Sequence, residues 1–309
     1  MTSPGLVGDA VEIAGDTSDA RVMGIDPVAT YSLGSSDGET GRLRRQADEL
    51  ASESQSLIDR VGLRPGDSAI DLGCGPRGVI DLLHRRVSPG GRVLGMDSDP
   101  AHVAIARELI AEQSLSGVEI VQGDARRTGL PHGSFDLVHA RTLLINVPQP
   151  EEVLAEMVRL AKPGGWVAGL EPEPSLNICY PPSPALDRIS ELFSAAFTRH
   201  GADPQVGRKL AQSYRDAGLD EVEVEARASI YPVGHSRRTI RVDLIRAMRP
   251  QILELGLADE AELDELDVSA RAHLQKDVVV MPHLNILVWG RKPAVASPGR
   301  HAQRTDSCA

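Results

Sequence analysis

The chain has 309 residues, of which 41% are hydrophobic and 25% are charged, a composition that suits a globular protein with a substantial core. A formal net charge of -11 excludes a generally basic surface for nucleic acid or anionic membranes. No apolar run reaches the roughly 18 residues of a membrane helix, and the amino terminus lacks the features of a secretory signal. Cys74, Cys179 and Cys308 follow neither disulfide nor zinc spacing. We therefore expect a cytoplasmic protein with no nucleic-acid or membrane partner.

The first sixty residues predict an arm followed by a helix. Residues 1–30 lack a clear period, and we expect an irregular arm there. Apolar side chains then recur at helical spacing, and Asp37 precedes them as a candidate N-cap. These apolar positions are Leu43, Ala47, Leu50, Leu57, Ile58 and Val61. We assign residues 1–60 to an N-terminal arm and a lid helix.

Strands and helices alternate in the next part of the chain. We expect strands at 68–72, 92–97, 118–122, 135–140 and 166–171, and helices at 79–87, 101–113 and 151–161. Such alternation is typical of an α/β fold in which helices cover both faces of a parallel sheet. Right-handed crossovers then leave few topologies open.

The second half of the chain has a different pattern. Two helices are expected at about 185–200 and 207–217, and strands at 222–232 and 284–290. The stretch between the two strands predicts helices, which we interpret as a helical cap inserted at about 234–282. The core domain would then cover residues 61–292. The tail, 293–309, is poor in apolar residues and is expected to be disordered.

A glycine-rich turn follows the first predicted strand, in the sequence DLGCGPRG at residues 71–78. Glycines at a strand-to-helix turn allow the backbone to approach a ligand at the carboxyl edge of the sheet. Taken alone, this spacing also fits a dinucleotide-binding fingerprint. Asp97 ends the next strand and could accept hydrogen bonds from ribose hydroxyls, or could instead cap the following helix.

Two further motifs count against the dinucleotide-binding interpretation. GDA at residues 123–125 closes the third strand, where an acid can accept from an adenine amino group, and KPGG at 162–165 leads into the fifth strand. In order and spacing, DLGCGPRG, GMDSD, GDARRTGLPHGSFDLVHAR and RLAKPGGWV resemble the successive motifs of class I S-adenosylmethionine-dependent methyltransferases. The resemblance is to the branch that contains ubiquinone- and menaquinone-biosynthesis enzymes and bacterial natural-product methyltransferases.

This resemblance implies a fold and a cofactor site. The fold would be a Rossmann-like, doubly wound, seven-stranded sheet, mostly parallel, that ends in an antiparallel hairpin. The resemblance implies S-adenosylmethionine as the cofactor, bound by Tyr31, Gln46, Asp71, Gly73, Cys74, Gly75, Asp97, Ser98, Gly123, Asp124, Ala125 and Arg141. Asp71 and the glycines would surround its methionine part, and Asp124 would meet its adenine. Arg77 departs from the family pattern, in which a small glycine is common, and its role stays open. Cys74 is also interpreted as a packing residue rather than a nucleophile.

Candidate groups for the acceptor side lie at the carboxyl ends of the fourth and fifth strands. Glu171 and His139 are candidate general bases, because open α/β sheets bind ligands at the carboxyl ends of their strands. Both residues, and Glu173, could instead be solvated rim residues. Four aromatic side chains could line a pocket or belong to the core, namely Tyr180, Tyr231, Phe193 and Phe197. No cluster has metal-ligand spacing, so we expect no metal.

The predicted cap carries several arginines followed by an acidic run at 259–267. The arginines are Arg237, Arg238, Arg241, Arg246 and Arg249. They could form a pocket for an anionic group of the substrate, because arginine offers paired donors. Surface ion pairs between neighbouring helices explain them equally simply, and we favour this interpretation.

Together these features predict transfer of a methyl group to the oxygen, nitrogen or carbon of a small acceptor, in secondary metabolism or quinone-like biosynthesis. A protein of this fold that binds the cofactor but catalyses a cyclisation, or only binds, is the main alternative. An NAD-dependent oxidoreductase would explain the glycine spacing alone. An RNA methyltransferase is disfavoured by the net charge of -11. The oligomeric state stays open, with a homodimer among the alternatives.

Overall fold

The computed structural model describes residues 37–294. The chain divides into two units, Met1–Thr30 and Tyr31–Ala309, and the fold described here belongs to the second. The expected arm, Tyr31 and residues 295–309 of the expected tail lie outside the described residues.

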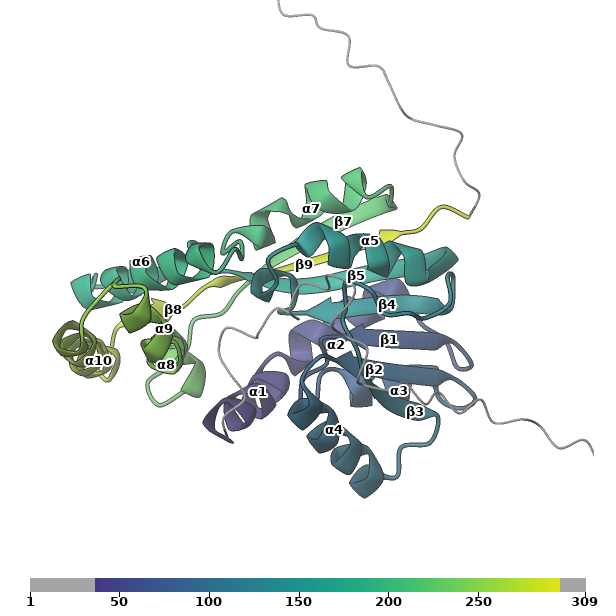
Figure 1. The fold of residues 1–309 in the computed structure, drawn as a ribbon, viewed down its shortest axis with the longest axis horizontal. Coiled ribbons are helices and arrows are strands. Elements are labelled where there is room, and N and C mark those ends of the chain that lie inside the picture. The colour runs from purple at the N-terminus through teal and green to yellow at the C-terminus, as the bar shows by residue number, and fades with distance from the viewer. Residues whose placement is uncertain (1–36, 295–309) are drawn as a thin grey trace, which may run out of the picture. The chain divides into compact units, whose positions relative to one another are not determined.

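A seven-stranded sheet forms the centre of this unit (Figure 1). The strands lie in the order β3 (Val118–Gln122), β2 (Arg92–Asp97), β1 (Ser68–Leu72), β4 (Phe135–Arg141), β5 (Ala161–Glu173), β9 (Leu284–Arg291) and β7 (Asp220–Ala228). The first five run parallel, and β9 pairs antiparallel with both β5 and β7. The predicted sheet and its final antiparallel hairpin are confirmed.

Helices cover both faces of the sheet, as the alternating pattern predicts. One face packs against α2 (Ala51–Val61), α3 (Ile80–Val87) and α4 (Pro100–Gln113). The other packs against α5 (Pro150–Leu160) and α7 (Val206–Asp216). The central strand β1 is buried on both sides because its apolar residues alternate between the two cores, with Ala69 in one and Ile70 in the other.

The cap helices gather at one end of the sheet (Figure 1). The elements of the predicted cap are the 3-10 turn η2 (Ser236–Thr239), α8 (Ile240–Ala247), α9 (Arg249–Glu254) and α10 (Glu260–Leu274), and the earlier helix α6 (Pro184–Arg199) packs against the last three. A small antiparallel ribbon of β6 (Ile178–Tyr180) and β8 (Val279–Met281) accompanies them and was not expected from the sequence. Helices therefore make up most of the stretch 234–282, which ends in β8, whereas the domain boundaries that we assigned stay predictions.

The structure corrects two details of the N-terminal and C-terminal elements. The expected single helix up to Val61 is two helices, α1 (Asp37–Glu49) and α2, which meet at Leu50 with backbone angles φ -98° and ψ 8°. Helical spacing persists across the break because Leu50 still donates its N–H to the carbonyl of Gln46. The strand expected at 222–232 ends at Ala228.

Candidate active site

The turn between β1 and α3 contains three glycines with left-handed backbone, Gly73, Gly75 and Gly78. Gly73 has φ +65°, and a Cβ there would lie 2.7 Å from Cδ1 of Leu143. Gly75 has φ +57°, and a Cβ there would meet nothing within 4 Å. Residues with side chains rarely adopt this conformation. The turn thus requires glycine and leaves open space beside Gly75, which suits the close approach of a ligand.

Asp71 is the penultimate residue of β1 and binds this turn. Its side chain is buried, and Oδ2 accepts the backbone N–H of Val79 at 3.0 Å. Oδ1 shares a hydrogen bond of 2.7 Å with Nδ1 of His139. A Cβ at Gly78 would lie 2.2 Å from Oδ2 of Asp71, so the carboxylate also requires a glycine at 78. The side chain of Asp71 therefore shapes the turn by binding the backbone of the turn.

Asp97 ends β2 and faces the same turn. Oδ2 accepts the N–H of Gly75 at 2.7 Å, and Oδ1 accepts the N–H of Asp99 at 2.9 Å. A carboxylate has about four acceptor positions, so two positions remain for other donors. The helix-cap interpretation of Asp97 is wrong, because Asp99 is the residue that caps α4, by accepting the N–H of Ala101. Ser98 beside it is exposed.

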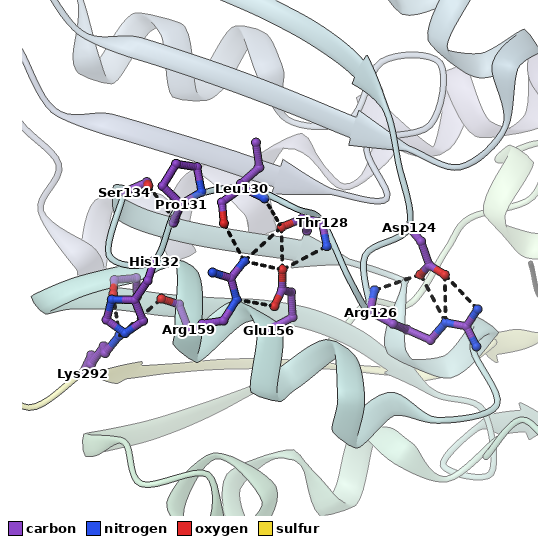
Figure 2. Close-up of polar contacts among 11 residues, drawn as sticks. Asp124, Arg126, Thr128, Leu130, Pro131, His132, Ser134, Glu156, Arg159 and Lys292 are labelled. Carbon is purple, nitrogen blue, oxygen red and sulfur yellow. Dashed lines mark hydrogen bonds and ion pairs between the residues drawn. The ribbon is translucent and has the colours of Figure 1, made fainter. Parts of the chain in front are cut away.

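The end of β3 is tied to β2 by Gly123, whose N–H donates to the carbonyl of Asp97 at 2.9 Å. Asp124 follows, and its carboxylate accepts from the side chain of Arg126 at 2.8 Å and from its backbone N–H at 2.9 Å (Figure 2). The hydrogen bond from Arg126 lowers the pKa of Asp124. Ala125 packs against the core. The expected adenine contact of Asp124 would thus share its carboxylate with Arg126.

A second carboxylate fixes the loop that follows Asp124. Glu156 on α5 accepts the backbone N–H of Thr128 at 2.9 Å and a side-chain bond from Arg159 (Figure 2). Arg159 also donates to the carbonyl of Leu130 at 2.7 Å. The hydrogen bond from Arg159 holds the pKa of Glu156 at about 2. This loop is therefore preorganised by α5.

Arginines join the glycine turn to the helices in front of it. Arg141, at the end of β4, donates to the carbonyl of Gly78 and to Oγ of Ser54 on α2, both at 3.0 Å. Arg77 forms an ion pair with Asp48 on α1. The charged residue that departs from the family pattern thus attaches α1 to the turn. Cys74 is 3% exposed, and burial raises the pKa of its thiol, in agreement with a packing role.

A cavity of about 390 Å³, here called the acceptor cavity, lies at the carboxyl ends of β4 and β5. Its walls come from α1, from the loops after β4 and β5, and from the cap. They include Arg42, Gln46, Leu50, Thr142, Ile145, Asn146, Phe193, Phe197, Arg237, Arg241, His283 and Asn285. The rings of Phe193 and Phe197 stack with centroids 4.2 Å apart. Both alternatives for these two residues are thus realised, because they are buried and also line the cavity.

The structure places Glu171 and His139 behind this cavity. Glu171 is fully buried, and its carboxylate accepts the N–H groups of Leu143, Leu144 and Ile145 at 2.8, 2.9 and 3.2 Å. His139 is also fully buried against Asp71. Neither residue lines the acceptor cavity. The described partners are peptide N–H groups for Glu171 and the carboxylate of Asp71 for His139, and a role of either residue as the base for the acceptor stays a prediction.

Burial raises the pKa of Glu171 to about 7, against the lowering effect of its three peptide donors. Glu173 is likewise fully buried, so the interpretation of both residues as solvated rim groups is wrong. Oε1 of Glu173 accepts from Nη2 of Arg208 at 2.9 Å. Tyr180 is 70% exposed and, like Tyr231, is not among the residues that line the cavity.

The arginines of the cap divide into different roles. Arg249 pairs with Glu260 and Asp264 at the surface, as the simpler interpretation expects. Arg238 is buried and donates to four backbone carbonyls, those of Leu274, Tyr231, Lys276 and Val278. Arg237 and Arg241 line the acceptor cavity. The preference for surface pairs is therefore wrong for these two and for Arg238.

Several residues of the cavity were not singled out from the sequence. Thr142 has a left-handed backbone with φ 53°, and strained residues of this kind cluster at functional sites. Its carbonyl accepts from Nδ2 of Asn146 at 2.7 Å. His283 and Asn285 reach the cavity at the start of β9. A polar pair at the start of an apolar strand is the sequence signal that could have indicated them.

Comparison with known proteins identifies the family. A family model described as a methyltransferase domain matches residues 70–169. A 37.1 kDa protein in transposon TN4556 of Streptomyces fradiae is 36% identical over 208 residues, which are 63% of this chain and 57% of that protein. A demethylmenaquinone methyltransferase of Bacillus cytotoxicus is 31% identical over 185 residues, which are 56% of this chain and 77% of that enzyme.

Solved structures show the same fold. The YcgJ protein from Bacillus subtilis superimposes with a TM-score of 0.53 at 16% identity, over 78% of this chain and 99% of that one. A Haemonchus contortus phosphoethanolamine N-methyltransferase, solved with S-adenosylhomocysteine and phosphomonomethylethanolamine, gives 0.52 at 18% identity, over 78% of this chain and 52% of that one.

The sheet order, the glycine turn after β1 and the carboxylates at the ends of the next two strands define a class I S-adenosylmethionine-dependent methyltransferase. The family match and the relatives agree with this class. The chain belongs to the branch of that family that contains the ubiquinone- and menaquinone-type methyltransferases.

Proposed function

We propose that this methyltransferase acts on a small-molecule acceptor bound in the acceptor cavity. One observation carries the proposal. The side chain of Leu143 lies against Gly73 of the glycine turn between β1 and α3, here called the cofactor turn, while the adjacent Thr142 lines the cavity. The same short loop therefore borders both the cofactor turn and the cavity, as transfer from one bound molecule to another requires.

The residues of the turn fit S-adenosylmethionine. The open space beside Gly75 accommodates its methionine part next to the backbone of Gly73 and Cys74. The two remaining acceptor positions of Asp97 match two ribose hydroxyls, with Ser98 beside it. Residues 123–125 would border the adenine. Arg141 binds the turn through the carbonyl of Gly78. Gln46 would close over the methionyl end of the cofactor. The family resemblance gives Tyr31 the same role.

When bound, the cofactor supplies a methyl group on a positively charged sulfur, and displacement leaves the electron pair of the broken bond on that sulfur. The protein's own contribution is to bind, align and exclude water. The apolar walls made by Phe193, Phe197 and Leu50 serve the last of these tasks. Because Glu171 and His139 lie behind the cavity, we propose alignment rather than proton removal by either residue.

The setting of the reaction follows from the relatives. The demethylmenaquinone methyltransferases among them support a biosynthetic role in quinone-like or secondary metabolism. The described residues contain no helix that is both long and apolar enough to span a membrane. We propose a cytoplasmic enzyme with a small acceptor, and a homodimer is one of its candidate assemblies.

The experiment that tests this function is an incubation of the protein with cell extract and S-adenosylmethionine labelled in its methyl group. We expect a labelled small molecule in the mass spectrum that is absent with the variant Asp97→Asn. The variant Asp136→Asn is a matched control, because Asp136 binds Ser68 and Lys162 at the start of β4. Tight binding of S-adenosylhomocysteine without any labelled product would contradict transfer and favour a binding or cyclisation role.

A further inference from the structure

Arg237 is a buried cation with unused donors. Its side chain lines the acceptor cavity and is only 2% exposed. Nη2 bonds to Nε2 of His283 at 2.7 Å, whereas Nε and Nη1 have no hydrogen-bond partner among the described residues. Buried polar groups are almost always paired, and a charged group left without its bonds is costly. Such a group needs a partner that the chain itself does not supply.

The neighbours of Arg237 neutralise it only in part. Oε2 of Glu49 lies 3.6 Å from Nη1, which is an ion pair beyond normal hydrogen-bond reach. The pKa of His283 is lowered to about 3 by desolvation and by two arginines, so its ring is neutral at physiological pH. Of the charged side chains that line the cavity, Arg42, Arg237 and Arg241 are positive and Glu191 is negative. The lining thus favours a negative ligand.

The other two cavity cations already have partners. Arg42 donates to Oε1 of Gln46 at 2.7 Å. Arg241 donates to Oδ1 of Asn177 at 2.9 Å and to the carbonyl of Leu186 at 3.0 Å. Both terminal nitrogens of Arg241 are therefore hydrogen-bonded, whereas Arg237 has such a bond at Nη2 alone.

Asn146 has a buried hydrogen-bond acceptor without a partner among the described residues. Its Nδ2 donates to the carbonyl of Thr142, which fixes the orientation of the amide. Its Oδ1 is buried and has no partner among the described residues, and Asn146 itself lines the same cavity. Two residues that line the cavity thus hold unpartnered polar atoms, donors on Arg237 and an acceptor on Asn146.

We propose that the acceptor carries a carboxylate that binds Arg237, and a hydroxyl or amine that donates to Asn146. This inference rests on the proposed function and names the substrate class of the same site. A carboxylate has enough lone pairs for both unused nitrogens of Arg237, and charge-assisted bonds of this kind are strong. Stacked Phe193 and Phe197 suit a planar, apolar body between these polar ends.

The test compares matched ligands in the presence of saturating S-adenosylhomocysteine, which prevents turnover. The probes are salicylate, 1-hydroxy-2-naphthoate and indole-3-carboxylate, each with its own amide, titrated by calorimetry. We expect at least one carboxylate to bind the wild type about tenfold or more tighter than its amide, as charged hydrogen bonds would give. Arg237→Gln should remove this preference, and the surface variant Arg249→Gln should retain it.

A second variant keeps the test decisive if Arg237→Gln does not fold. Glu49→Gln removes the charge that competes for Arg237, so carboxylate affinity should rise about fivefold or more. Equal binding of every carboxylate and its amide by the wild type, or no gain in Glu49→Gln, overturns the inference. Titration of S-adenosylhomocysteine alone separates the two proposals. If S-adenosylhomocysteine does not bind, the proposed function is wrong. If it binds but no carboxylate is preferred over its amide, only this inference is wrong.

Discussion

The substitution Glu171→Gln separates a positioning role of this residue from a role as a base. The carboxylate accepts three backbone N–H groups from the loop after β4. A glutamine keeps one acceptor oxygen for Leu143 and Leu144, but its amide group must face the N–H of Ile145, donor against donor. Leaving a buried donor unsatisfied costs about 1–3 kcal/mol, which is the loss of unfolding free energy that we expect near pH 5.

The cost of this substitution should depend on pH. Burial raises the pKa of Glu171 from 4.5 to about 7 in the folded protein. The unfolded chain releases this proton first, so the wild type loses stability as the pH rises from about 4.5 through 7. That interval, at about 1.36 kcal/mol per pH unit, bounds the loss at about 3 kcal/mol. The glutamine of the variant does not titrate, so the stability difference between wild type and variant should shrink toward zero by pH 8.

Urea denaturation followed by the fluorescence of the two tryptophans, Trp166 and Trp289, measures these differences at pH 5 and pH 8. Single-turnover methyl transfer to an identified acceptor supplies the second readout. A positioning residue should keep the rate within about tenfold, whereas loss of a general base costs about 10²–10⁴-fold. A stability difference that is the same at both pH values, together with a rate loss of the larger size, would refute the reasoning.

Three other substitutions probe separate parts of the fold. Asp97→Asn should weaken S-adenosylhomocysteine binding by about tenfold or more in calorimetry, because a charged double acceptor is lost; unchanged affinity would remove Asp97 from the cofactor site. Tyr214→Phe should leave thermal stability unchanged or raise it by up to about 1 kcal/mol, because the buried hydroxyl has no hydrogen-bond partner among the described residues. Glu156→Gln should cost about 1–3 kcal/mol at pH 7 in urea denaturation. This cost should shrink as the pH falls from 4.5 toward 2, where the carboxylate of Glu156 takes up its proton.

The sheet was predictable because its signals are local. Apolar runs such as 68–72, turns with glycine and helices of ordinary length each report their own structure, and their order leaves one family of topologies. Asp97 was predictable for the same reason, since it ends a strand beside the glycine turn and the carboxyl ends of parallel strands share one edge. The break at Leu50 was not, because the apolar spacing continues across it.

The acceptor side could not be predicted because its geometry is set by distant packing. Arg237 and Arg249 are indistinguishable in sequence, yet one lines a cavity and the other pairs at the surface with Glu260. Which of them is buried depends on how η2 and α8 dock on α6 and α1. Glu171 has the same limitation, since an acid at the end of a strand can turn toward a ligand or toward a neighbouring loop.

Three carboxylates at the carboxyl edge of the sheet show what decides whether an acid binds a neighbouring loop or stays available to a ligand. Asp71, Asp97 and Glu171 lie within the last three residues of their strands, and each accepts a peptide N–H group from a loop at the same edge. Asp97 accepts from the loop after β1, and Glu171 from the loop after β4, so each of these two acids holds the loop of a neighbouring strand. The side chain of Asp97 is 11% exposed, so its unused acceptor positions can be reached from outside. The side chains of Asp71 and Glu171 are at most 2% exposed.

This arrangement couples the buried acid to the cofactor turn. Glu171 fixes the N–H of Leu143, and the side chain of Leu143 lies against Gly73 in the turn. A displaced loop would therefore reach the cofactor turn through Leu143 and the acceptor cavity through Thr142 and Ile145. Glu171 would in this way help to set the distance between cofactor and acceptor, and such alignment is the contribution that we propose for the protein.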